Sequence, residues 1–261
     1  MELITGAILS LILIFITVKK KAFTLAAALT AGVILMTSAF AAGLAGIFIV
    51  LAAYGAIFAV DLVIGKRSEK ITASINKKSG ARGMSQVLVN ASAAIAALVL
   101  KMIFGGEEWI AVYAVALTEC LADSLASDVG VLSKGDPIDL CRLHRIPRGL
   151  SGGVSLLGTL AALAGCVFMS LFTLIFFGFD PKYFFSILVL PMIGVMLDSV
   201  LGSLLQAKYV CRVCARPTEK PIHCEKPSLH AGGVTFITNN AVNLISNLVT
   251  AAVAVLVLII L

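Results

Sequence analysis

Charge is the scarcest property of this sequence. Asp, Glu, Lys and Arg make up 13% of its 261 residues, whereas soluble domains contain about 25%. So little charge excludes a soluble enzyme, a disordered protein and a secreted disulfide scaffold as descriptions of the whole chain. Apolar residues account for 60% of the sequence instead. The composition therefore predicts an all-α, polytopic transmembrane helix bundle in one domain, 1–261.

Two common sequence signals are also missing. No G-x-x-x-x-G-K-[ST] motif occurs anywhere in the chain, so a P-loop nucleotide site is excluded. The first apolar run starts almost at Met1 with no basic segment before it and no clear cleavage site after it. We therefore expect a retained helix rather than a signal peptide.

The apolar runs predict eight membrane crossings, because a helix needs about 20 apolar residues to cross a bilayer. The stretch 22–64 is too long for one crossing, and the region of Gly43 and Gly46 is the natural place to break it. The expected crossings are 3–18, 22–40, 44–64, 84–104, 109–129, 154–177, 183–206 and 241–261.

Eight crossings place nearly all cations on one side of the membrane. The segments 19–21, 65–83, 131–153 and 207–240 hold 18 of the 20 Lys and Arg residues. The positive-inside rule then predicts that these four segments are short cytoplasmic loops and that both termini lie outside. This topological bias explains most of the net charge of +6, so nucleic-acid binding is not needed to account for it.

Several acids fall inside the predicted helices, where each ionised side chain is expensive unless it faces the bundle interior. Glu119 and Asp123 are four residues apart and share a helix face, with Asp128 nearer the cytoplasmic mouth. Asp198 is expected to join them from another helix. An oxygen-rich group of this kind has the ligand chemistry of Mg²⁺. The alternative is that these polar residues only join helices by hydrogen bonds.

Basic residues and glycines in the cytoplasmic loops predict phosphate binding. The run Ser151-Gly152-Gly153 is expected to open the sixth helix, where backbone N–H groups would form an anion site. Arginines just before it can grip phosphate oxygens. The alternative is that the glycines only form a turn and that the basic residues only set the membrane topology.

The last loop, 207–233, contains a candidate zinc knuckle. Cys211 and Cys214 are spaced C-x₂-C, and His223 and Cys224 follow. His223 and Cys224 are adjacent in the sequence, which makes it difficult for both to bind the same ion. His230 is therefore an alternative ligand. A structural role for Zn²⁺ is expected here.

Six stretches of the chain resemble an integral-membrane family, long of unknown function, that includes the phytyl-phosphate kinases. They are 83–90, 121–130, 151–159, 197–206, 211–224 and 240–246. The block Ser151-Gly-Gly-Val-Ser-Leu-Leu-Gly is the most specific. Asp128 stands where the family usually has Glu, and Arg148 with 150–151 alters a segment that usually reads Pro-Pro-Gly-Thr.

The resemblance implies transfer of the γ-phosphoryl group of CTP or another nucleoside triphosphate to an isoprenoid monophosphate. Glu119, Asp123 and Asp198 would then hold Mg²⁺, with Asp128 assisting. The expected phosphate and nucleotide ligands are Lys77, Lys78, Arg82, Gln86, Asn90, Lys134, Arg145, Arg148, Ser151, Gly152, Gly153, Ser155, Asn240 and Asn243. The alternatives are a cytidylyltransferase that makes a CDP-lipid and a transporter or flippase of lipid phosphates.

Overall fold

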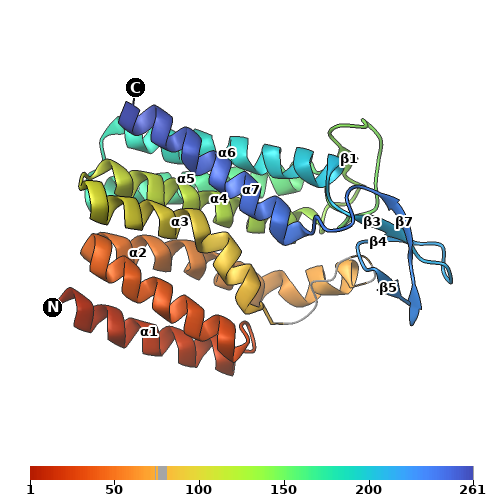
Figure 1. Ribbon diagram of the computed structural model, residues 1–261, viewed down its shortest axis with the longest axis horizontal. Helices are drawn as coiled ribbons and strands as arrows, with labels where there is room; N and C mark the ends of the chain where they lie inside the picture. Colours follow the sequence, from red (N-terminus) through yellow and green to blue (C-terminus); the bar gives the residue numbers. More distant parts are fainter. Residues whose placement is uncertain (74, 76–80, 261) are drawn as a thin grey trace.

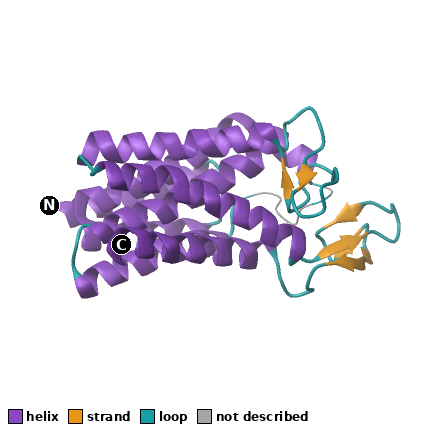
Figure 2. Ribbon diagram, turned by 90° about the horizontal axis from the view of Figure 1, so that it is seen from above, coloured by secondary structure: helices purple, strands orange, loops and turns teal. Residues whose placement is uncertain are grey.

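The computed structural model describes residues 1–73, 75 and 81–260, and consists of a helix bundle with small strands at one end (Figures 1 and 2). Seven helices in the described residues are long and apolar enough to cross a membrane. They are α1 (Glu2–Lys19), α2 (Leu25–Thr72), α3 (Met84–Phe104), α4 (Glu108–Gly130), α5 (Leu156–Phe177), α6 (Pro181–Leu204) and α7 (Asn239–Val255), which a π-helical turn (Leu256–Ile260) extends.

The chain nevertheless passes along the bundle eight times, because α2 folds back on itself at Gly43. This glycine has φ 56° and ψ −142°, a conformation that residues with a Cβ atom avoid. The two arms of α2 run in opposite directions (Figure 1), and the Tyr113 hydroxyl donates to the Gly46 carbonyl at 3.0 Å just beyond the reversal. The predicted eight crossings and their break near Gly43 are confirmed.

The second arm of α2 is longer than the sequence predicted. We expected it to end at 64, yet the helix continues to Thr72. An arm of about 29 residues spans about 43 Å, which exceeds the roughly 30 Å hydrocarbon thickness of a bilayer. Its last turns, with Lys66, Arg67 and Lys70, therefore project into the layer that carries the strands (Figure 1).

Helix α4 is the centre of the bundle. It packs against α2, α3, α5, α6 and α7, and its residues from Ile110 to Ala122 are all buried. Small and medium apolar side chains all round the helix, such as Ala111 and Val115, allow this close approach of neighbours on every side. Polar groups within this buried stretch, such as Thr118 and Glu119, are consequently enclosed by other helices.

In the described residues, seven short strands lie in two loops at one end of the bundle, where the sequence predicted short loops (Figure 2). The first loop contains β1 (Ile138–Asp139) and β2 (Gly153–Val154), which pair with each other. The second contains β3 (Lys208–Val210), β4 (Pro217–Thr218), β5 (Ile222–His223), β6 (Lys226–Pro227) and β7 (Leu229–Gly232). Strand β3 lies between β4 and β7, and β5 pairs with β6.

Both termini lie at the opposite end of the bundle from these strands (Figure 1). The α1–α2 turn, the end of α2 and both strand-bearing loops share the strand end. The described parts of the four basic segments are thus gathered at one end, as the predicted topology required.

Candidate functional site

Three acids from two helices meet on the polar face of α7. The Ser246 hydroxyl lies 3.1 Å from Glu119 Oε1 on α4 and 3.2 Å from Asp198 Oδ2 on α6. One turn closer to the strand end, Asn243 Nδ2 donates to Asp123 Oδ2 at 3.4 Å. Glu119, Asp123 and Asp198, which were predicted to form one group, thus each accept a hydrogen bond from a side chain of α7.

The α7 side chains form a ladder that begins at the strand end and reaches the middle of the bundle. Asn239 Nδ2 donates to Asn243 Oδ1 at 2.8 Å, and Asn247 Nδ2 donates to Glu119 Oε2 at 2.6 Å. These residues recur every three or four positions, which places them on one face of the helix. Ser246 and Asn247 were not among the predicted site residues, although their spacing from Asn243 was a readable signal.

Asn247 is also distinctive because one of its buried polar atoms has no hydrogen-bond partner within the described part of the chain. The residue is 1% exposed, and its Nδ2 atom donates to both Glu119 Oε2 and the Ala116 carbonyl. Its Oδ1 atom is buried and has no hydrogen-bond donor among the described residues. A buried acceptor without a partner is uncommon and indicates an absent donor or cation.

The acids of α4 lie at different depths in the bundle. Glu119 lies at the midpoint of α4, and it is 3% exposed. Asp123 and Asp128 follow toward the strand end, and both are partly exposed. The polar face therefore descends from the strand end to the centre of the bundle.

Asp128 is paired with Arg82 instead of joining the other acids. Arg82 Nη2 lies 3.3 Å from Asp128 Oδ2, and both side chains are about one-third exposed. The backbone N–H of Arg82 donates to the Ala22 carbonyl, which fixes the residue beside the α1–α2 turn. Arg82 thus stands between the acidic face of α4 and the first two helices.

An apolar cavity of about 240 Å³ begins beside Arg82. Side chains from α1 and both arms of α2 line it, among them Leu13, Leu35 and Phe58. Asp61 and Arg82 also line it and are the charged residues in its wall. The cavity therefore combines an apolar interior with a cation that is shared with the α4 face.

The prediction that Ser151-Gly152-Gly153 opens a helix is wrong. Gly153 lies in β2, and α5 begins only at Leu156 with Ser155 as its cap, whose Oγ accepts from Gly158 N at 3.2 Å. Gly152 has φ 89°, and a Cβ atom there would lie 2.6 Å from the Ser203 Cα atom. Close packing against α6 thus explains this glycine without a phosphate.

Glu219 of the second strand-bearing loop, which was not among the predicted site residues, contacts the first loop. Its Oε1 atom accepts a hydrogen bond from the Ser151 N–H at 2.8 Å. In the first loop, Asp139 is buried and accepts from Ser203 Oγ at 2.6 Å and from the backbone of Cys141 and Arg142. Burial raises the pKa of Asp139, but these hydrogen bonds and the charge of Lys208 outweigh it and hold the pKa below its usual value.

The other predicted phosphate ligands are dispersed around the strand end. Arg145 Nη1 donates to the Asp136 carbonyl at 3.4 Å, Arg148 Nη1 donates to the Ser133 carbonyl at 3.1 Å, and Lys134 is exposed. An arginine has five donors, so both guanidinium groups retain donors for a ligand. Lys77 and Lys78 lie outside the described residues.

Three other predicted amide ligands contact uncharged groups. Gln86 Oε1 accepts from Gly83 N at 3.0 Å and caps α3. The Asn90 side chain hydrogen-bonds Cys120, and Asn240 Nδ2 lies 3.4 Å from Ser85 Oγ. Asn243, by contrast, donates to Asp123 of the acidic group.

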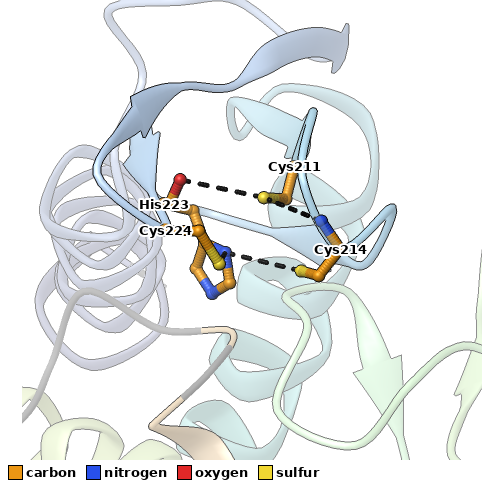
Figure 3. A group of neighbouring side chains, drawn as sticks. All are labelled: Cys211, Cys214, His223 and Cys224. Carbon is orange, nitrogen blue, oxygen red and sulfur yellow. Dashed lines mark hydrogen bonds between the residues drawn. The ribbon is translucent and has the colours of Figure 1, made fainter.

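The cysteine and histidine residues of the last loop converge as predicted. The ligand atoms of Cys211, Cys214, His223 and Cys224 all lie within 4.8 Å of one another (Figure 3). Hydrogen bonds from the backbone of Cys214 and Val213 outweigh burial and lower the pKa of the Cys211 thiol to about 6. His230 lies outside this cluster, with its ring against Tyr209.

Comparison with known proteins identifies the family of this chain. The profile of the integral membrane protein family DUF92 matches residues 8–251. The chain belongs to the DUF92 family. This agrees with the eight-pass bundle and with the resemblance that the site motifs predicted.

Two relatives show how far the similarity extends. Protein PGR of Arabidopsis thaliana is 28% identical over 96% of this chain and 94% of its own length. An uncharacterized membrane protein of Synechocystis is 32% identical over 62% of this chain and 64% of its own length. No solved structure matches the chain.

Proposed function

We propose that this DUF92 protein is a membrane-embedded, Mg²⁺-dependent kinase that transfers the γ-phosphoryl group of CTP or another nucleoside triphosphate to an isoprenoid monophosphate. The observation that carries the proposal is the contact of Ser246 with both Glu119 and Asp198. The hydroxyl contacts both carboxylates and helps to orient them. Because it has one proton, it can donate to only one of them at a time. Carboxylates gathered in this way are suited to sharing a cation.

The donor set fits Mg²⁺. Glu119, Asp123 and Asp198 offer carboxylate oxygens, and Asn247 offers a buried amide oxygen without a donor among the described residues. Oxygen ligands from a few carboxylates, with remaining positions for substrate phosphates, are what Mg²⁺ prefers. When bound, the ion would neutralise phosphate charge.

The protein's own residues account for the remaining requirements. A phosphate monoester acceptor is already ionised, so phosphoryl transfer to it needs no strong general base. Catalysis then depends on positioning and charge neutralisation, for which Arg145, Arg148 and Lys134 at the strand end are available. Asn243 would orient Asp123, to which it donates.

The apolar cavity suits the lipid part of the substrate. Its wall is formed by aliphatic and aromatic side chains of α1 and α2, and Arg82 lies at its edge. A prenyl chain in this cavity would place its phosphate near Arg82. Asp128, the ion-pair partner of Arg82, is five residues from Asp123, or about 7.5 Å along the helix axis. The acceptor and the acidic face would therefore be neighbours.

The test is an assay of purified protein in detergent with Mg²⁺, a panel of nucleoside triphosphates and phytyl or geranylgeranyl phosphate. Mass spectrometry should detect the prenyl diphosphate. Asp123→Asn should lower kcat by about 100-fold, a typical loss when one charge-stabilising group is removed. Glu107→Gln, which changes an exposed acid at the other end of the bundle, is the matched control. Full activity of Asp123→Asn would contradict the proposal.

Transport of a lipid phosphate is the second candidate, and the depth of Glu119 favours it. Transporters bind substrates near the middle of the membrane, and Glu119 lies at the midpoint of α4. Movement of a prenyl phosphate across liposomes without nucleotide turnover would support transport. Within the enzyme class, α-phosphate label in the lipid would indicate cytidylyl transfer, whereas γ-phosphate label would indicate a kinase.

A further inference from the structure

We propose that Cys211, Cys214, His223 and Cys224 bind one Zn²⁺ ion that clamps the strand-bearing loops to the end of α2. The inference concerns a second site, away from the acids, and does not depend on the kinase proposal. The four ligand atoms converge from two separate turns of the chain (Figure 3). Three sulfur ligands and one imidazole are a common set for structural zinc.

The distances between the ligand atoms suit a tetrahedral ion. Cys214 Sγ lies 3.7 Å and Cys224 Sγ lies 3.2 Å from His223 Nδ1. With Zn–S near 2.3 Å and Zn–N near 2.0 Å, the ligand atoms of a tetrahedral site stand about 3.5–3.8 Å apart. Small adjustments of exposed side chains would complete this geometry.

The first turn has the backbone of a metal knuckle. The Cys211 Sγ atom accepts hydrogen bonds from Val213 N at 3.3 Å and from Cys214 N at 3.5 Å. Ala215, the next residue, has φ 55°, which ends the turn sharply. Donors directed at a sulfur stabilise its negative form, and the thiolate is the form that binds a metal.

The second turn explains how neighbouring residues can both be ligands. Strands β5 and β6 pair His223 with Lys226, which leaves Cys224 and Glu225 as a two-residue hairpin loop. Both loop residues have positive φ, 50° and 61°, the conformation of a type I′ turn that favours Asn and Gly. This conformation brings Cys224 Sγ to the Nδ1 side of the His223 ring, and a bound ion would offset its strain.

The segment between the two turns holds other parts of the strand end together. Thr218 Oγ1 and Glu219 N both donate to the Ile75 carbonyl, at 3.0 and 2.9 Å. Lys220 Nζ lies 2.6 Å from the Ala73 carbonyl, and Glu219 accepts from Ser151 N. Because ligands flank this segment on both sides, an ion bound to them would fix residues 217–220 against α2 and the first loop.

Metal content of the purified full-length protein is the first test. Elemental analysis should give about one zinc per chain, and Co²⁺ substitution should give the intense visible absorption of a tetrahedral thiolate site. Cys214→Ser and Cys224→Ser should each lose most of the zinc. Cys141→Ser removes an exposed cysteine outside the cluster, and His230→Ala removes the nearby histidine, so both should keep the metal.

Hydrogen exchange of the unmodified protein tests the clamp without relying on the folding of a variant. A zinc-selective chelator should increase exchange in peptides that cover 148–154 and 205–224, and added Zn²⁺ should reverse the increase. Peptides from the buried part of α4 should not change. Unaltered exchange at 148–154 after zinc removal would overturn the clamp. A zinc content near zero, or a disulfide among these cysteines in freshly purified protein, would overturn the metal site.

Discussion

Asn247 donates its side-chain amide to Glu119 at 2.6 Å, in the most enclosed part of the bundle. The two residues come from α7 and the central helix α4, and both are almost completely buried. This contact joins the last helix to the central helix, and it lies at the deepest point of the polar face. Stability and the candidate site are therefore linked at this pair.

Asn247→Ala should destabilise the protein. The change removes donors to Glu119 Oε2 and the Ala116 carbonyl, and an unsatisfied buried acceptor costs about 1–3 kcal/mol. Unfolding in detergent should show this loss. Asn240→Ala, which removes a longer and partly exposed contact with Ser85, should change the unfolding free energy by less than about 0.5 kcal/mol. Equal losses in both variants would show that the Glu119 contact is not special.

Arg82→Gln should raise the KM for the prenyl phosphate more than it lowers kcat. Hydrogen bonds to a charged partner contribute about 1.5–3 kcal/mol, so the expected increase in KM is about 10-fold or more. Steady-state kinetics with the lipid and the nucleotide varied separately would measure it. Arg67→Gln, an exposed arginine on the projecting end of α2, is the control. A rise in the nucleotide KM alone would instead place Arg82 at the nucleotide.

Hydropathy predicted the passes of the bundle well because burial in lipid imposes one length on every helix. It predicted the end of α2 poorly, since residues 66–70 are polar yet continue the helix beyond its last apolar turn. The strands of two to four residues were missed for another reason. They are too short to have a repeating pattern of their own, and some pairings, such as Lys208 with Gly232, join segments that lie far apart in the sequence.

The candidate site was predicted in part. The spacing of Glu119 and Asp123 places them on one face, so local geometry was sufficient for that pair. The contacts of Ser246 and Asn247 depend on how α7 is rotated against α4 and α6, which spacing within one helix does not determine. The glycines at 152–153 misled for a physical reason, because glycine serves close helix packing as well as anion binding.

Gly43→Ala should destabilise the reversal of α2. The backbone at this position has φ 56°, and the new Cβ atom would lie 2.8 Å from Glu2 Oε1. Strain of this kind costs about 1–3 kcal/mol. Gly55→Ala is the matched control, because nothing lies within 4 Å of its added Cβ and it is helical. Thermal unfolding should separate the two variants, and equal stability would contradict a conformational requirement for glycine at 43.

Asp139 should make stability depend on pH at the acidic end. Burial raises its pKa, but hydrogen bonds from Ser203 and the backbone lower the pKa by a larger amount. The folded-state pKa therefore lies below the usual 3.8. The ionised form therefore favours folding: its contribution is fully present above the unfolded-state pKa and is lost as pH falls through the folded-state pKa. The stability gap between wild type and Asp139→Asn should be constant from about pH 7 to 5 and shrink below about pH 4. Unfolding at several pH values would measure the gap, with Asp136→Asn controlling for loss of an exposed acid in the same loop. A gap that persists undiminished at the lowest pH would show that the hydrogen bonds of Asp139 do not depend on its charge.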